Sequence, residues 1–275
     1  MSKSSLKKLL QAYLDIEKLK LVPRGFDMIG HVAILEIPDE LKKEKRMIAK
    51  ALMEVNKNIQ TVLEKTSGRK GKLRLREYRF LAGKKKYETI HREYGAQFRL
   101  NPAKVYFSPR ELTERQRIAE QVKPGETVMV MFSGACPYPI AIAKRQPKVK
   151  VIAIELNKIA HKYAVENVRI NKVGDKIIPV FGDARKKSEK WFGKCDRVVM
   201  PLPLGAEDFL DVAVKCLKRK GVVHFYNWGD EDNLFENATR LIKERIKRKY
   251  KILGMGKVLP YSPKKWKVCI DFKVG

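Results

Sequence analysis

Two acidic residues that end predicted buried strands have the chemistry to bind a nucleoside. Glu155 lies at the end of the apolar run at residues 149–156, and Asp183 lies at the exit of the next run, residues 176–185. One such carboxylate can accept hydrogen bonds from both hydroxyls of a ribose, and the other from the exocyclic amine of a base. Each acid alone is equally well explained as a solvated residue or a helix N-cap. At successive carboxyl ends of one sheet, they predict a nucleoside-binding cleft.

A turn of small residues precedes the two acids in the chain. Residues 132–137 read FSGACP, so a ligand can approach the backbone closely there. The turn has a single glycine and therefore lacks a dinucleotide fingerprint. We predict that the cleft is completed by residues of this turn and by the neighbours of the two acids: Phe132, Ser133, Gly134, Leu156 and Ala184.

The elements that position these residues alternate between strand and helix patterns through residues 101–275. Five apolar runs have the length of strands: 127–132, 149–156, 176–185, 195–203 and 221–228. Segments with helical spacing separate them. This alternation predicts an α/β fold with a parallel, doubly wound sheet. Residues 232–250 predict a long basic helix, and residues 251–261 and 266–274 predict a closing antiparallel pair.

Residues 1–100 follow a different pattern and predict a small α+β module. An apolar run at residues 32–37 predicts a strand, and helical spacing predicts a helix over residues 41–56. Three further segments predict hairpin strands: 73–83, 87–95 and 96–102. We therefore expect two domains, at residues 1–100 and 101–275.

The charge of the chain predicts a polyanionic partner. Lysine and arginine number 60 against 31 acids, which gives a net charge of +29. A lysine-rich proteome with ion-pair surfaces is the alternative, but it predicts matching acids, which are only half as common here. Nucleic acid is the partner that such a charge favours, because neutralising phosphates releases counterions.

Other features of the composition exclude several classes of protein. Hydrophobic residues make up 44% of the chain, which is enough for a folded core. There is no apolar run of roughly 18 residues and no signal-peptide pattern, so we expect no membrane span. The four cysteines have no zinc-ligand or disulfide spacing. We expect a reduced, cytoplasmic protein without a metal.

The order of the small-residue turn, Glu155 and Asp183 resembles that of class I S-adenosylmethionine-dependent methyltransferases. Further segments resemble, more specifically, the archaeal and eukaryotic tRNA (guanine-N1)-methyltransferase family: PRGFDMIG at 23–30, REYRFLAG at 76–83, VYFSPR at 105–110 with Glu114 four residues later, and the C-terminal Tyr261 and Asp271. The resemblance implies a Rossmann-like methyltransferase sheet preceded by a small α+β RNA-binding module. It also implies S-adenosyl-L-methionine as cofactor and, as substrate, the guanosine 3′ of the anticodon, position 37, in the tRNA anticodon stem-loop. We expect the protein to be a monomer.

The sequence departs from the family pattern in its cofactor and substrate motifs. Val130 stands where the family has an aspartate, and Cys136 stands where it has a second glycine. Residues 201–203 read Pro-Leu-Pro where the family has Asn-Leu-Pro. This variant resembles an archaeal subset that also methylates 4-demethylwyosine at C7 on the path to wyosine. About twenty residues precede Pro23, so we expect no room for the family's module that reads the tRNA elbow.

The resemblance and the chemistry of guanine together predict the catalytic residues. Guanine N1 must lose a proton as the methyl group arrives, and Glu114 is the candidate base. Its alternative role is to complement a helix dipole. Arg76 or Arg110 can stabilise the charge that develops on guanine O6, although Arg110 is equally suited to clamp a phosphate. The carbonyl groups around Pro201 can hold a purine edge of the cofactor or the substrate.

Two other functions remain open at this point. A related wybutosine enzyme transfers the aminocarboxypropyl group of the same cofactor, and the family comparison implies that it lacks the pair Arg110 and Glu114. A non-catalytic tRNA-binding relative is the other alternative, because Val130 and Cys136 weaken the cofactor loop. The basic run at residues 241–251 is expected to contact the tRNA backbone, or to be a solvated helix face.

Overall fold

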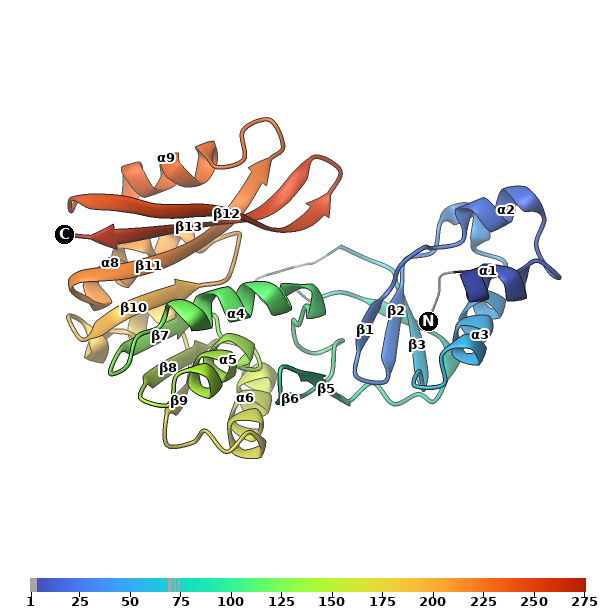
Figure 1. Ribbon diagram of the computed structural model, residues 1–275, viewed down its shortest axis with the longest axis horizontal. Helices are drawn as coiled ribbons and strands as arrows, with labels where there is room; N and C mark the ends of the chain where they lie inside the picture. The colour runs from blue at the N-terminus through green and yellow to red at the C-terminus, as the bar shows by residue number, and fades with distance from the viewer. Residues whose placement is uncertain (1–3, 69–70, 72, 74) are drawn as a thin grey trace. The chain divides into compact units, whose positions relative to one another are not determined.

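The chain forms two compact units. A computed structural model (Figure 1) describes residues 4–68, 71, 73 and 75–275. Its contacts divide the chain into an N-terminal unit, Met1–Pro109, and a C-terminal unit, Arg110–Gly275. Phe107 packs against Phe98 and His91 with ring centroids 5.7 and 5.1 Å apart. These contacts keep the residues just beyond position 100 with the N-terminal unit.

The N-terminal unit is built on a four-stranded sheet with the order β1–β2–β3–β4. The strands are Asp27–Ile29, Val32–Leu35, Thr61–Lys65 and Tyr78–Gly83. The helices α1, α2 and α3, at Ser4–Leu10, Ile16–Leu21 and Lys45–Val55, share one apolar core with this sheet. Strands β2 and β3 are parallel, and α3 supplies the crossover that parallel neighbours require.

A separate two-stranded sheet completes the N-terminal unit. Strands β5 (Thr89–Glu93) and β6 (Ala96–Leu100) pair as an antiparallel hairpin. Tyr94 and Gly95 between them have φ values of 43° and 70°, as a tight type I′ turn requires. The predicted hairpin is confirmed for these two strands. The strand predicted within residues 73–83 is also present as β4, and it pairs antiparallel with β3 in the larger sheet.

Gly30, in the turn between β1 and β2, lies too close to β5 for any side chain. Its φ is +55°, and a Cβ there would lie 2.1 Å from Thr89 Oγ1 and 2.6 Å from the Ile90 carbonyl oxygen. We expect Gly30→Ala to lower the free energy of unfolding by about 2 kcal/mol. The β1–β2 turn and β5 must move apart to make room for the methyl group, and alanine is strained at this positive φ. Gly25→Ala is the matched control, since nothing lies within 4 Å of its Cβ position. Equal urea midpoints for the two variants would contradict this expectation.

The C-terminal unit contains a seven-stranded sheet with the order β12–β13–β11–β10–β7–β8–β9 (Figure 1). In chain order from β7, the strands are Thr127–Met131, Lys150–Glu155, Ile177–Phe181, Cys195–Met200, Leu217–Asp230, Tyr250–Ser262 and Lys265–Val274. The five strands β7 to β11 are parallel, and β13 is antiparallel to both β11 and β12. The predicted doubly wound α/β sheet and its closing antiparallel pair are confirmed.

Helices cover both faces of this sheet. Helices α4 to α9 are Leu112–Gln121, Pro137–Arg145, Lys158–Ile170, Ala184–Lys187, Leu210–Cys216 and Glu236–Arg245. In Figure 1, α4, α5 and α6 lie in front of the sheet. Apolar side chains of α7, α8 and α9 share one core with alternate strand residues such as Met129 and Met131. Short 3-10 turns connect elements of both units at Asp39–Leu41, Pro109–Glu111, Glu189–Trp191 and Glu207–Phe209.

The basic segment near the C-terminus is only partly helical, so the prediction of a long helix over residues 232–250 is wrong. Helix α9 ends at Arg245, and the backbone at Ile246 is extended. The side chain of Ile246 is buried in the same core as that of Ile242. The chain therefore leaves the helix early and enters β12 at Tyr250.

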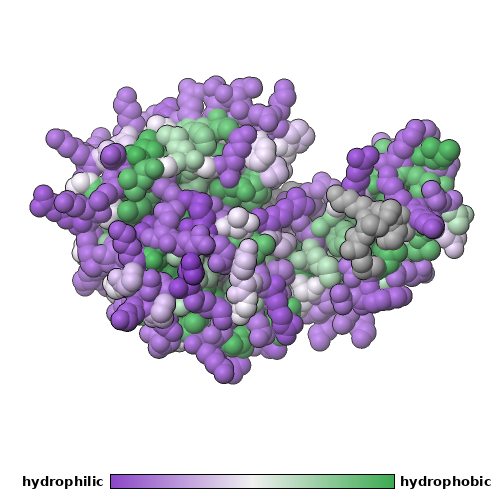
Figure 2. Space-filling view, in the orientation of Figure 1, coloured by the Kyte–Doolittle hydropathy of each residue, from purple (hydrophilic) through white to green (hydrophobic). Residues whose placement is uncertain are grey.

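The surface is polar, as the charge of the chain requires. Hydrophilic side chains cover most of the visible face in Figure 2, with small apolar patches between them. Within the described residues, no helix has both the length and the apolar composition that crossing a bilayer demands.

Candidate cofactor and active site

The strand order of the C-terminal unit reverses direction between β7 and β10. The chain moves outward from β7 through β8 to β9 and then returns to β10 on the other side of β7. Such a reversal of direction is where parallel α/β sheets bind ligands. The loop after β7, Glu155 at the end of β8, Asp183 after β9 and Pro201 after β10 all lie at this edge.

Glu155 and the small-residue turn are joined directly. Glu155 Oε2 accepts a hydrogen bond from the Gly134 N–H at 2.7 Å, and Oε1 accepts one from the Asn157 N–H at 2.6 Å. Burial raises the pKa of Glu155, and these backbone donors oppose that effect. Each carboxylate oxygen keeps a further lone pair that can accept from a ribose hydroxyl. The structure thus brings together two of the residues predicted from the sequence.

The turn itself is held by backbone hydrogen bonds. The Ser133 N–H donates to the Ile154 carbonyl at 2.9 Å, and the Cys136 N–H donates to the Ser133 carbonyl at 3.0 Å. Phe132 has a φ of 58°, a value that residues other than glycine rarely adopt. Its ring packs edge-on against that of Phe209, with the ring centroids 5.0 Å apart. This geometry presents the backbone of the turn at the sheet edge.

Asp183 is exposed and caps helix α7. Its Oδ1 accepts from the Arg185 N–H at 2.7 Å, so Asp183 is the N-cap of α7. Its second carboxylate oxygen takes no part in that bond. Ala184 beside it is buried in the core. Leu156, directly after β8, and Phe181, the last residue of β9, are 46% and 45% exposed. Apolar side chains so exposed at this edge could pack against the face of a purine. Leu156 is one of the residues expected from the sequence, whereas Phe181 is not.

Glu114 is buried near the same edge, on the first turn of α4. Its Oε1 accepts from the Tyr226 hydroxyl at 2.5 Å and from Arg117 Nη2 at 2.8 Å, and its Oε2 accepts from Arg117 Nε at 2.8 Å. Burial raises the pKa of Tyr226, so the phenol keeps its proton and donates. Tyr226 lies one residue beyond Phe225, which pairs with Met200 across β10 and β11. Glu114 is therefore held near the carboxyl end of β10, which Pro201 follows.

Arg117 connects Glu114 to a second buried carboxylate, Asp271 on β13. Arg117 Nη1 donates to Asp271 Oδ2 at 2.5 Å, and Gln121 Nε2 donates to the same oxygen at 3.2 Å. His224 Nδ1 lies 2.6 Å from Asp271 Oδ1. Burial by itself raises the pKa of Asp271, but the hydrogen bond from His224 and the hydrogen bond and charge of Arg117 outweigh it and hold the pKa well below its ordinary value.

His224 is neutral, and its tautomer follows from its neighbours. Arg197 Nη1 lies 2.6 Å from His224 Nε2, and a guanidinium can only donate, so Nε2 holds a lone pair and Nδ1 carries the proton. Burial lowers the pKa of His224, against the opposing effect of Asp271. Arg197 is held in turn by Glu126, at 2.9 Å from Nε. A continuous network therefore runs from Tyr226 to Glu126.

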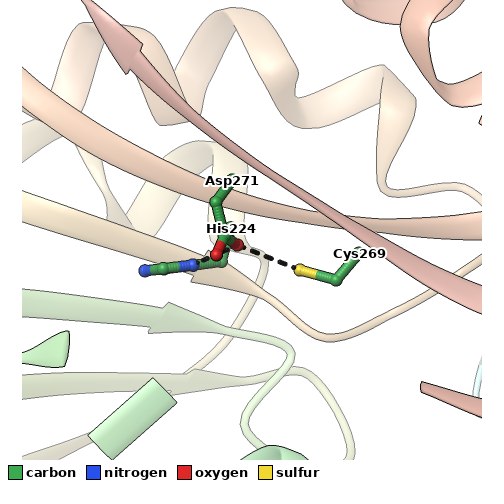
Figure 3. Close-up of side chains that lie close together, drawn as sticks. All are labelled: His224, Cys269 and Asp271. Atoms are coloured by element: carbon green, nitrogen blue, oxygen red, sulfur yellow. Dashed lines mark hydrogen bonds and ion pairs between the residues drawn. The ribbon is translucent and has the colours of Figure 1, made fainter. Parts of the chain in front are cut away.

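Figure 3 shows His224, Cys269 and Asp271 converging in this network. Their ligand atoms lie within 4.8 Å of one another, which is a spacing that a metal ion could bridge. The Cys269 thiol instead lies 3.3 Å from Asp271 Oδ1, and both arginines of the network add positive charge. Hydrogen bonds account for this cluster, and the adjacent guanidinium groups disfavour a cation.

Comparisons with known proteins decide the family. Residues 89–253 match the TRM5/TYW2 methyltransferase domain, and residues 6–86 match the TYW2 N-terminal domain. The chain belongs to the TRM5/TYW2 methyltransferase family. The family resemblance read from the sequence is confirmed. The match to the methyltransferase domain begins at β5 of the N-terminal unit and continues through the C-terminal unit to residue 253.

Curated relatives in this family carry out different reactions. The chain is 39% identical over 261 residues to "tRNA (guanine(37)-N(1))-methyltransferase Trm5b" of Pyrococcus abyssi, covering 94% of this chain and 77% of the relative. It is 31% identical to "tRNA 4-demethylwyosine(37)-methyltransferase Taw21" of Saccharolobus solfataricus, with coverages of 91% and 94%. It is 32% identical to the "tRNA(Phe) (4-demethylwyosine(37)-C(7)) aminocarboxypropyltransferase" of Pyrococcus horikoshii, with coverages of 99% and 97%.

Solved structures of TRM5/TYW2 proteins have the same fold as this chain. A complex of aTrm5 with tRNALeu superposes with a TM-score of 0.86 at 32% identity, covering all of this chain and 79% of that one. TYW2 of Pyrococcus horikoshii in complex with MeSAdo superposes with a TM-score of 0.82 at 31% identity, covering 99% of each chain. The predicted Rossmann-like sheet preceded by a smaller module is therefore confirmed.

Cys136 fits the turn although the TRM5/TYW2 pattern has glycine at its position. Its φ is 66°, in the left-handed region where glycine is the favoured residue. Its side chain is fully buried at the start of α5, and burial raises the pKa of the thiol to about 12. The cysteine is therefore an unreactive, packed side chain. Val130, the other departure from the pattern, is fully buried within β7.

The two predicted arginines belong to different units. Arg76 lies in the N-terminal unit, where its Nε is buried and has no hydrogen-bond partner among the described residues. Arg110 begins the C-terminal unit and is exposed. Sequence reasoning missed Arg117, although the spacing of Glu114 and Arg117, three residues apart on a helix, is a recognised ion-pair signal.

Proposed function

We propose that the protein is an S-adenosyl-L-methionine-dependent methyltransferase that acts as a monomer on N1 of guanosine 37 in the tRNA anticodon stem-loop. The observation that carries this proposal is the buried Glu114 carboxylate near the carboxyl end of β10, which Pro201 follows. N1 methylation needs an acceptor for the guanine proton, and a carboxylate at this edge has the required chemistry. The charge of +29 and the TRM5/TYW2 membership support tRNA as the substrate.

The residues at the sheet edge fit the proposed cofactor. When bound, S-adenosyl-L-methionine supplies a methyl group already activated on a sulfonium. Glu155 has lone pairs for ribose hydroxyls, Asp183 has a carboxylate oxygen for the adenine amine, and Leu156 offers an exposed apolar surface. We assign the backbone of Phe132, Ser133 and Gly134 to the remaining part of the cofactor, and Ala184 to the wall beneath the adenine.

The remaining predicted residues act on the guanine. Glu114 takes the N1 proton, while Tyr226 and Arg117 fix the direction of its carboxylate. Arg76 or Arg110 stabilises the charge on O6. Carbonyl groups around Pro201 hold the purine edge, since proline itself has no N–H to offer.

We expect Glu155→Ala to weaken binding of S-adenosyl-L-methionine by about 1–3 kcal/mol, because ribose hydroxyls and the Gly134 and Asn157 N–H groups lose their acceptor. Isothermal titration calorimetry measures the change. Glu120→Ala, an exposed acid on α4, is the control and should bind as the wild type does. Unchanged affinity in Glu155→Ala would remove Glu155 from the cofactor site.

Two other reactions at the same site have specific support. The Pro-Leu-Pro segment at residues 201–203 and the Taw21 relative favour methylation of 4-demethylwyosine at C7 as a second activity. The TYW2 N-terminal domain and the full-length match to the aminocarboxypropyltransferase favour aminocarboxypropyl transfer as the alternative function. Neither alternative requires another cofactor.

One experiment separates these reactions. Purified protein is incubated with S-adenosyl-L-methionine and either a tRNA transcript with guanosine at position 37 or the same tRNA carrying 4-demethylwyosine. Nuclease digestion and mass spectrometry then identify the group added to nucleoside 37. A methyl group on N1 of guanosine supports the proposal, whereas an aminocarboxypropyl group on the wyosine base would replace it. No product and no cofactor binding would indicate a non-catalytic tRNA-binding relative.

A further inference from the structure

The N-terminal unit contains a cavity of about 700 Å³ whose lining includes none of the cofactor residues. It lies between the turn joining β1 and β2, the loop before β3 and the hairpin of β5 and β6. Its volume is typical of sites that take a molecule of nucleotide size. The side chains that matter for binding are Met28, Asn58, Gln60, Lys86, Arg92 and Arg99.

The cavity has an excess of positive charge. Lys86, Arg92 and Arg99 line it together with the acid Glu88. Lys86 and Arg92 are exposed, so both side chains can reach an incoming ligand. A concave site with three cations from two neighbouring segments favours an anion with several oxygen acceptors, such as a phosphate group.

Two histidines hold the walls of the cavity in place. His31 Nδ1 lies 2.9 Å from Thr89 Oγ1, and its Nε2 lies 3.3 Å from the carbonyl oxygen of Lys86. His91 Nδ1 accepts from the Gly30 N–H at 3.3 Å. These bonds tie the β1–β2 turn to β5 and to the backbone that carries Lys86. The backbone that carries Lys86 is thus fixed before any ligand arrives, which lowers the entropic cost of binding.

Other side chains of the lining suit a base. Asn58 and Gln60 are exposed amides that can both donate to and accept from a base edge. Met28 and Ile90 add apolar surface against which a base can pack. Phosphate-binding cations, amides and an apolar wall in one cavity match the parts of a single nucleotide.

We infer that this cavity binds one nucleotide of the tRNA, with its phosphate at Lys86, Arg92 and Arg99 and its base against Met28 between Asn58 and Gln60. The inference rests on the proposed function in taking tRNA as the substrate. It gives the N-terminal unit a defined contact with the RNA, in addition to a diffuse electrostatic attraction. Phosphate contacts of this kind set the position of an RNA strand and make its binding sensitive to salt.

The full-length Lys86→Gln/Arg92→Gln variant tests the phosphate contact. We expect its dissociation constant for tRNA to rise about tenfold or more at moderate salt, and the slope of log K against log salt to fall by about 1–2. Arg46→Gln/Lys50→Gln is the matched control, because it removes one lysine and one arginine from exposed positions of α3 in the same unit. Identical affinities and slopes for the two variants would overturn the inference.

The Asn58→Ala/Gln60→Ala variant tests the base contact. It should weaken tRNA binding several-fold without changing the salt slope, because it removes no charge. Wild-type affinity in this variant would overturn the base assignment. Cofactor affinity should stay at the wild-type value in all variants, and thermal unfolding shows whether each is folded.

Two further measurements distinguish a tRNA-binding cavity from a site for a free nucleotide and from a failure of the proposed function. Guanosine monophosphate is titrated as a free nucleotide. If it binds tightly, if that binding is lost in the Lys86→Gln/Arg92→Gln variant, and if the variant still binds tRNA normally, the cavity is a site for a free nucleotide. That result would overturn the inference. Methyl transfer is measured independently. Wild-type protein that binds tRNA through the cavity but transfers no group would refute only the proposed function, whereas active protein whose cavity variants bind tRNA normally would refute only the cavity inference.

Discussion

Replacing Glu114 with glutamine is expected to slow single-turnover methylation by roughly 10²–10⁴. Glutamine has nearly the same size but cannot accept the guanine N1 proton. Binding of tRNA and of S-adenosyl-L-methionine should stay within a few-fold of wild type, because the carboxylate matters most as charge develops in the transition state. Rapid-quench measurement of the chemical step, together with both dissociation constants, separates these quantities.

The structure sets the controls for the Glu114 variant. An amide oxygen can accept from Tyr226 or Arg117, but the amide N–H₂ then faces one of these donors, so some loss of stability is expected. Thermal unfolding measures that loss, and Glu120→Gln, an exposed acid on the same helix, controls for the charge change. Methylation at the wild-type rate from about pH 6 to 9 would show that Glu114 is a structural helix residue and that another group takes the proton.

Asp271→Asn is expected to lower the free energy of unfolding by about 3–5 kcal/mol, because it breaks a buried ionic network from one side. The asparagine oxygen can face either His224 or Arg117, and the amide N–H₂ then opposes a donor on the other residue. His224 cannot relieve this conflict by changing its tautomer, since Arg197 donates to Nε2. Urea unfolding measures the loss, and Asp175→Asn, an exposed acid, should be close to neutral.

The pH dependence of stability gives an independent check on Asp271. Its pKa in the folded protein is below the ordinary value of 3.8, so the carboxylate stabilises the fold above that pH. This contribution is lost as the pH falls below 3.8 toward the folded pKa. The difference in stability between wild type and Asp271→Asn should therefore shrink in acid. A constant difference from neutral to strongly acidic pH would mean that the charge of Asp271 is not what stabilises the fold.

Local patterns in the sequence were sufficient for the C-terminal fold and for half of the candidate site. Alternating apolar runs identified the five parallel strands, because a strand buried on both faces must be apolar throughout. Glu155 and Gly134 were predicted to line one cleft and are hydrogen bonded to each other, because consecutive parallel strands end at the same edge. Local pattern does not predict which strand pairs with which where a segment has two possible neighbours. In the N-terminal unit, β4 pairs with β3 and not with β5.

What the sequence by itself determined is the family, the parallel sheet and the order of the residues proposed to bind the cofactor, since these depend on periodicity and on short motifs. The tertiary structure alone decided the surroundings of Glu114. Its partner Arg117 also binds Asp271, 154 residues away, and Asp271 meets His224 across 47 residues. The cavity of the N-terminal unit likewise joins Gly30 to His91 across 61 residues. No local pattern encodes such pairs, because side chains from distant segments meet only when the sheets place their strands side by side.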